Sequence, residues 1–175
     1  MDIFIEYMVK KKKQAKEYLL TLLIAFAAAL LMFVAFFGLL GVAPQFASII
    51  LLLVVGIGYG AYWLITSFNI EFEYSLVNDE IDVDKIINVK RRKRLTTVKI
   101  RGLEAFGKKS DGTMGNYLKD SSLEKIYACR DINESDVYYA VYSEKDKRKI
   151  IFFNPSEKMV DAIKKLNPFK TMNLS

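Results

Sequence analysis

The chain has 175 residues and a formal net charge of +6, from 26 basic and 20 acidic side chains. It contains no histidine and one cysteine, Cys129. This composition excludes a disulfide framework within the chain, a zinc site made of cysteine and histidine, and catalysis that depends on a histidine base.

Residues 1–17 form a short basic arm with five lysines and three acidic residues. Asp2 stands where it could cap a helix, and an apolar patch follows it at helical spacing. The patch consists of Ile3, Phe4, Tyr7 and Met8. We therefore predict a cytoplasmic arm that includes a short helix at the membrane interface.

The next 53 residues, Tyr18–Ile70, contain no aspartate, glutamate, lysine or arginine. One bilayer crossing takes about 20 apolar residues, so this stretch is long enough for two. The glycine and proline of the segment Gly41–Gln45 interrupt it near its middle. We predict a transmembrane hairpin over residues 18–68, with helices over 18–42 and 46–68. Two buried helices of a soluble core are the alternative, but such helices normally have a polar face, which both segments lack.

Basic residues flank the predicted hairpin on both sides in the sequence. Lys10–Lys13 precede the first span, Lys90–Arg94 follow the second, and the turn between the spans carries no charge. Because the cytoplasmic flanks of spans carry the excess of lysine and arginine, we expect both termini in the cytoplasm. The pattern thus predicts a multi-pass protein of the cell membrane, whose first partner is the lipid bilayer.

The second span contains two glycines four residues apart, Gly56 and Gly60. Small residues at this spacing let two helices approach closely in lipid. We expect the pair to pack against the alanine-rich first span, and the alternative is a contact between two copies of the chain in a homo-oligomer. Neither span contains an ionisable residue, so we expect no transport path through one protomer.

From residue 69 onward the pattern changes to the alternation of apolar and polar residues that is typical of β-strands. This pattern predicts strands over residues 70–76, 81–89, 96–100, 123–129, 137–143 and 149–153. The turn Asn78-Asp79 joins the first two as a β-hairpin. Residues 108–122 are rich in Gly, Ser, Asp and Lys and predict a loop. A seventh strand would involve either Leu103–Lys108 or Tyr117-Leu118.

The last predicted element is an amphipathic helix. Asn154 is the expected N-cap, Pro155 takes the first helical position, and Glu157 completes a capping box. An apolar stripe follows at helical spacing, made of Met159, Ala162, Ile163 and Leu166. This stripe indicates that the helix covers an apolar surface of the sheet.

Together these segments resemble a known family. The strands that open as FEYSLVNDEIDVDKI, the basic segment KRRKRL and the closing helix NPSEKMVDAIKKL are similar to bacterial pleckstrin-homology-like (PH-like) domains that follow a two-helix membrane hairpin. The resemblance implies an α+β membrane protein. Its transmembrane hairpin would come first, and residues 69–175 would form an antiparallel β-sheet or open barrel of seven strands that the C-terminal helix caps.

The candidate binding residues are all basic: Lys85, Lys90, Arg91, Arg92, Lys93 and Arg94. Basic residues close to a bilayer attract anionic lipid headgroups, so the run either contacts such lipids or only sets the membrane topology. In PH domains that bind phosphoinositides, the first loop between strands forms the cradle. That loop is only Asn78-Asp79 here, so we do not expect specific phosphoinositide binding. No aromatic stacking platform accompanies the charges, which argues against nucleic acid as a partner.

No combination of nucleophile, base and orienting residue can be assembled from this sequence, and we expect no metal and no cofactor. The acidic residues Asp79, Glu80, Asp82 and Asp84 lack the glycine and distal glutamate of an EF-hand loop. We expect a non-enzymatic, membrane-anchored binding or scaffold module that presents its cytoplasmic PH-like domain to a protein, a peptide or an anionic lipid. The alternative is an accessory subunit of a larger membrane transport or envelope-stress assembly, which would interact through its transmembrane helices.

Overall fold

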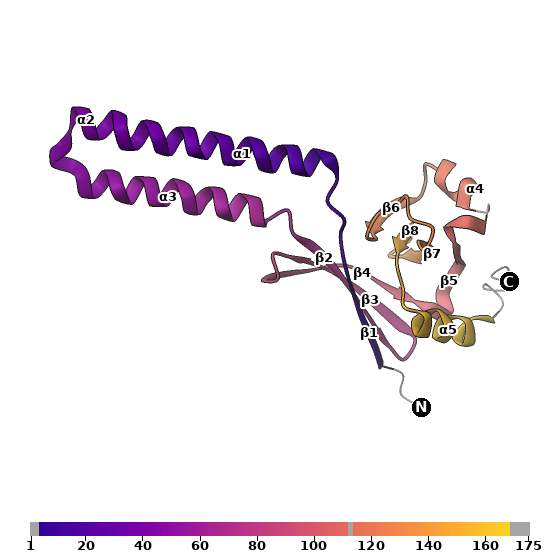
Figure 1. The fold of residues 1–175 in the computed structure, drawn as a ribbon. Coiled ribbons are helices and arrows are strands. Elements are labelled where there is room, and N and C mark those ends of the chain that lie inside the picture. Colours follow the sequence, from indigo (N-terminus) through magenta and orange to yellow (C-terminus); the bar gives the residue numbers. More distant parts are fainter. Residues whose placement is uncertain (1–3, 112–113, 169–175) are drawn as a thin grey trace. The chain divides into compact units, whose positions relative to one another are not determined.

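The computed structural model describes residues 4–111 and 114–168 (Figure 1). The chain divides into two compact units. Residues 13–69 form a helical unit, and residues 4–12 join the described residues from Ile70 onward in a sheet unit. The N-terminal segment therefore belongs to the same unit as the C-terminal part of the chain.

The helical unit is a hairpin of two long helical segments. Helix α1 (Ala15–Phe33) continues through a π-helical stretch (Val34–Leu39) into the short α2 (Leu40–Val42). After a 3₁₀ turn at Pro44–Phe46, helix α3 (Ala47–Thr66) runs back beside α1 (Figure 1). Both predicted helices are present. The first starts earlier than predicted because Gln14 caps it, with its backbone N–H 3.0 Å from the Glu17 carboxylate.

The apolar side chains of the hairpin are mostly exposed. Only a narrow seam between the helices is buried, with Ala28 and Ala35 on one side and Ile50 on the other. Within the most apolar window of each segment, 11% and 6% of the residues are buried, whereas a core helix of a soluble protein is mostly buried. By length and composition, both segments can cross a membrane.

The N-terminal arm forms strand β1 (Phe4–Lys10), which corrects the short interfacial helix predicted within it; its predicted cap Asp2 and the apolar Ile3 lie outside the described residues. Strand β1 pairs antiparallel with β2 (Ile70–Val77) along its whole length, from Phe4 opposite Val77 to Lys10 opposite Glu71. A helix of about seven residues is unstable alone in water, whereas pairing with β2 satisfies the backbone of β1 and buries Val9 in the core.

This pairing changes the domain boundaries. The sheet unit does not simply follow the hairpin, as predicted for residues 69–175, but begins before it. The helices are inserted into the connection between two adjacent strands of one sheet. The Lys11 N–H donates to the Ile70 carbonyl at 2.9 Å, so the chain leaves the sheet and returns to it at neighbouring points.

The first sheet has the order β1-β2-β3-β4 and is antiparallel throughout. Strand β3 is Glu80–Ile87 and β4 is Arg91–Lys99, so the basic segment lies mainly within a strand. The turn Asn78-Asp79 is confirmed, and Asn78 adopts a positive φ of 55° in it. Asparagine tolerates this left-handed conformation better than most residues.

The second sheet has the order β5-β7-β8-β6. Its strands are β5 (Leu103–Lys108), β6 (Glu124–Ala128), β7 (Tyr138–Glu144) and β8 (Lys147–Phe153). Strand β6 runs parallel to β8, which departs from the expected antiparallel arrangement. Of the two places considered for a further strand, Leu103–Lys108 forms one, whereas Tyr117-Leu118 lies in helix α4 (Met114–Lys119) within the predicted loop.

One core lies between the two sheets and helix α5 (Glu157–Leu166). Met159 and Ile163 of α5 are fully buried in it, as the apolar stripe predicts. The cap differs from the prediction: Ser156 is the N-cap, and its hydroxyl accepts from the Met159 N–H at 3.3 Å. Asn154 instead ties two loops to the core, because its side chain accepts from the Arg130 N–H and donates to the Asp136 carbonyl.

Candidate functional site

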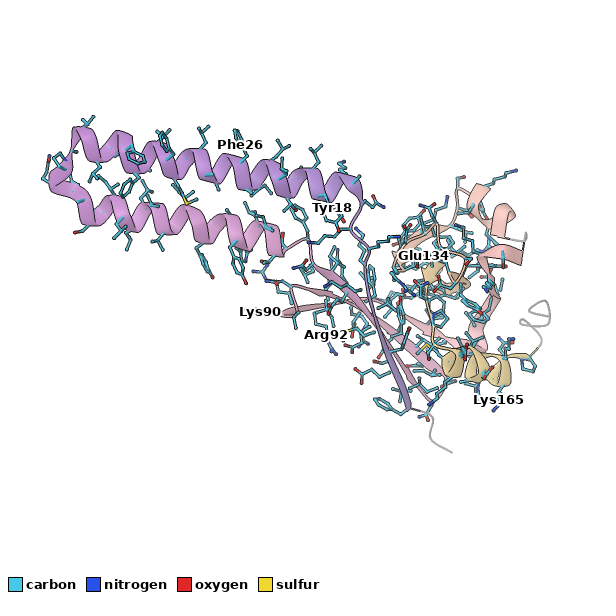
Figure 2. All side chains as sticks on the ribbon, in the orientation of Figure 1. Tyr18, Phe26, Lys90, Arg92, Glu134 and Lys165 are labelled. Carbon is cyan, nitrogen blue, oxygen red and sulfur yellow. The ribbon has the colours of Figure 1, made fainter. Side chains whose placement is uncertain are left out.

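Strand β4 divides the predicted basic residues between the two faces of the first sheet. Arg94 lies on the face of β2 and β3 that carries carboxylates, 2.6 Å from Asp84 and 2.7 Å from Asp82. Arg92 contacts Glu73 on the same face at 2.7 Å (Figure 2 labels Arg92). These two guanidinium groups are held by acidic residues of their own sheet.

The carboxylates in this network are shielded from solvent. Glu73 is 2% exposed and Asp84 is 4% exposed. Burial raises the pKa of Glu73, Arg92 opposes that rise, and the nearby Glu6 and Asp84 add to it. Because breaking a shielded ion pair leaves an uncompensated charge, Arg92 and Arg94 stabilise the sheet and are poor candidates for an outside ligand.

Lys85 and Lys93 lie on the opposite face. The strand register places them directly opposite each other, and Lys85 is also opposite Phe72, a core residue. Directly opposed residues of antiparallel strands share a face and lie about 5 Å apart at Cβ. Neither lysine forms an ion pair among the residues that the structure describes. Two like charges therefore face each other without a carboxylate between them, an arrangement that destabilises a strand pair.

The turn between β3 and β4 adds two unusual features. Val89 has a positive φ of 59°, which a β-branched residue rarely adopts, and its side chain is 78% exposed. Lys90 follows it at the tip of the hairpin (Figure 2). The tip thus presents an apolar side chain next to Lys90, and Lys85 lies nearby in β3.

This end of the sheet is also the end at which the chain enters and leaves the helical unit. Arg91 is opposite Ile87, which is opposite Ile70, the first residue of β2. Lys10 ends β1 at the same level, and the Lys12 N–H is bound by the Arg130 carbonyl at 2.9 Å. Lys10 at the end of β1 and Arg91 at the start of β4 therefore lie at the same end of the first sheet.

The two glycines of α3 are not placed as expected. A Cβ added to Gly56 or Gly60 meets no atom within 4 Å, so neither glycine packs against α1. The glycine in the seam is Gly58, where an added Cβ would lie 3.6 Å from the Met32 sulfur. The interpretation of Gly56 and Gly60 as an intramolecular packing pair is corrected, and this face of α3 is open.

The one thiol and the acidic residues of the described chain were the other candidates for chemistry. Cys129 is buried, and burial raises the pKa of its thiol to about 11. Among the described residues, no group of three or more His, Cys, Asp or Glu side chains is placed to hold a metal ion. Asp82 and Asp84 of β3 instead form ion pairs with arginines of β4, and Glu80 forms one with Lys99. The sequence alone did not reveal these partners, because they depend on the strand register.

The comparison with known families agrees with this architecture of two apolar helices, a sheet unit and a closing helix. The family model described as "Bacterial PH-like domain (DUF6106)" matches residues 1–173. The chain therefore belongs to this family, and its α+β PH-like fold, inferred from the resemblance, is confirmed. No curated protein and no solved structure matches the chain.

Strand β1 also corrects the position of the first loop between strands, which the sequence placed at Asn78-Asp79. The match starts at residue 1 and so includes β1, which makes the β1–β2 connection the first between strands. Asn78-Asp79 is the second connection. The first connection between strands in this chain therefore contains the two apolar helices.

Proposed function

We propose that this protein is a non-enzymatic, membrane-anchored binding module, whose PH-like domain is held at the cytoplasmic surface by a hairpin inserted between two of its strands. The observation that carries this proposal is the pairing of β1 with β2 on either side of the helices. The domain is thereby attached through two connections, Lys11–Gln14 and Ser67–Asn69.

The pairing also supports the proposed topology. Because β1 and β2 are hydrogen-bonded to each other, the segments before and after the helices must lie on the same side of any membrane that the helices cross. The chain then crosses an even number of times, as a hairpin does. The lysines before α1 and the basic residues after α3, set against the uncharged turn, favour the cytoplasm for that side.

A short double attachment keeps the domain close to the bilayer. Three or four residues span at most roughly 10–14 Å when fully extended, so the attached end of the sheet can lie within one Debye length of the bilayer, about 8 Å at physiological salt, and no more than about two. Basic groups at the attached end of the sheet would therefore remain within the electrostatic reach of anionic headgroups. This restricts the ligand to a molecule at the membrane surface: a lipid, or a protein or peptide that is itself found there.

Accessibility labelling in cells tests the anchor and its direction. In a Cys129→Ser background, Gln45→Cys lies in the turn between the helices and Lys145→Cys lies in the exposed turn between β7 and β8. A maleimide that cannot cross membranes should label Gln45→Cys in intact cells and Lys145→Cys only after permeabilisation. Release of the protein by alkaline carbonate, or labelling of Lys145→Cys from outside, would reject the proposal.

A second function is supported by the open face of α3. Gly56 and Gly60 are not used in packing against α1, so they remain available to another helix in the membrane. This arrangement favours the alternative of an accessory subunit in a larger membrane assembly, or of a homo-oligomer. The two functions are compatible, since one uses the sheet unit and the other uses the helices.

A further inference from the structure

We infer that the end of the β3–β4 hairpin is a binding site for the phosphate group of anionic lipids, formed by Lys85, Lys93 and Lys90, with Val89 as an apolar contact to the bilayer. This inference rests on the proposed function, since it requires the sheet unit to lie at a membrane. Of the predicted basic residues, the proposed site keeps the three lysines and leaves out Arg92 and Arg94.

The opposed lysines supply the main argument. A strand pair can hold two like charges opposite each other more easily when a counter-ion lies between them. The same sheet supplies carboxylates to Arg92 and Arg94 on its other face but supplies none to Lys85 and Lys93. A phosphate group, with its negative charge and several acceptor oxygens, can accept hydrogen bonds from both ammonium groups at once.

The hairpin tip indicates that the phosphate belongs to a lipid. Val89 is strained at its positive φ and 78% exposed, although an asparagine or glycine would fit the turn better. An exposed apolar residue next to Lys90 suits a segment that lies in the interface of an anionic membrane. A site for free phosphate would gain nothing from it.

The ion pairs on the carboxylate face of the first sheet leave its unpaired positive charge on the other face. Across the sheet, Glu73 and Asp84 are covered by the arginines, and their charges are compensated locally. The uncompensated positive charge of the first sheet is thus concentrated on the core-facing side of its attached end and at the hairpin tip. Headgroups would approach the sheet from that end.

The test uses the full chain, purified in detergent and titrated with phosphatidylglycerol or phosphatidylcholine, with retained lipid counted by native mass spectrometry. The test variant is Lys85→Gln/Lys93→Gln. Its matched control is Lys145→Gln/Lys147→Gln, which removes the same charge from two exposed lysines, one in the β7–β8 turn and one at the start of β8. We expect the test variant to lose phosphatidylglycerol affinity by about fivefold for each lysine. The control should retain the affinity of the natural chain, and phosphatidylcholine binding should not change.

Each outcome bears on a different part of the inference. Equal phosphatidylglycerol binding by the test and control variants would overturn the site. Displacement of the lipid by inorganic phosphate at a similar concentration would overturn the lipid as its source. Val89→Asn should weaken lipid retention, and a gain or no change would remove Val89 from the site. Carbonate extraction of the same samples shows independently whether the anchor itself has failed.

Discussion

At the scale of single residues, the raised pKa of the shielded Glu73 predicts how the stability of the folded chain depends on pH. Its folded-state pKa is raised, so the native chain binds this proton more tightly than the unfolded chain does. The resulting stabilisation is present below the ordinary carboxyl value of 4.5 and is lost as the pH rises through the raised pKa. The melting temperature of the natural chain should therefore increase relative to that of Glu73→Gln as the pH falls from 7 toward 4.5.

Arg92 provides the control for this titration. It lowers the Glu73 pKa, so Arg92→Gln should move the window in which the natural carboxyl adds stability to higher pH. Thermal unfolding followed by circular dichroism at several pH values measures both effects. A difference between the natural chain and Glu73→Gln that stays constant with pH would contradict the raised pKa.

Substitutions of Ser156 and Asn154 test which of the two residues is the N-cap of α5. Loss of the N-cap in Ser156→Ala should cost about 1 kcal/mol of unfolding free energy. Asn154→Ala should cost about 2 kcal/mol or more, because it removes a buried side chain that bonds two backbone groups. Chemical unfolding measures both values. If Asn154→Ala were the milder change, the buried bridging role of Asn154 would be wrong, whereas a Ser156→Ala variant as stable as the natural chain would favour the predicted cap at Asn154.

At the scale of elements, the sequence predicted best where one periodicity dominates. Helix α5 and strands β2 and β3 each show a single clear pattern and were found close to their observed bounds. Strand β1 was missed because its apolar residues fit the period of a helix as well as that of a strand. Its partner β2 begins only at Ile70, so no nearby segment indicated a hairpin. The partners of the basic run were missed for a related reason: a bulge between Val83 and Asp84 determines which residues of β3 and β4 are opposed.

The helical seam allows a prediction with its own internal control. Gly58 faces Met32, so Gly58→Leu should push α1 and α3 apart and lower the melting temperature of the detergent-purified chain. Gly56→Leu/Gly60→Leu adds side chains on the open face and should leave that temperature nearly unchanged. If α3 binds another helix there, this double variant alone should change migration on a native gel. Unchanged migration would count against a contact at these glycines.

At the scale of the whole molecule, the split sheet unit determines which pieces of the chain can fold. A fragment that starts at residue 69, as the predicted boundary suggests, lacks β1 and exposes the edge of β2 together with part of the core around Val9. An unpaired, largely apolar edge strand promotes aggregation. We therefore expect a fragment cut at the predicted domain boundary to be less stable than one that keeps β1.

Removing the helices instead should give a soluble domain. Lys11 and Ile70 are already joined by a hydrogen bond of 2.9 Å, so a short Gly/Ser linker in place of residues 13–69 would only close a β-hairpin. A loop of a few residues costs little closure entropy. We expect this variant to be monomeric, rich in β-structure and cooperative in thermal unfolding, whereas removing residues 1–10 from the same variant should cause aggregation or loss of the transition. If both variants folded equally well, β1 would not be an integral strand of the domain.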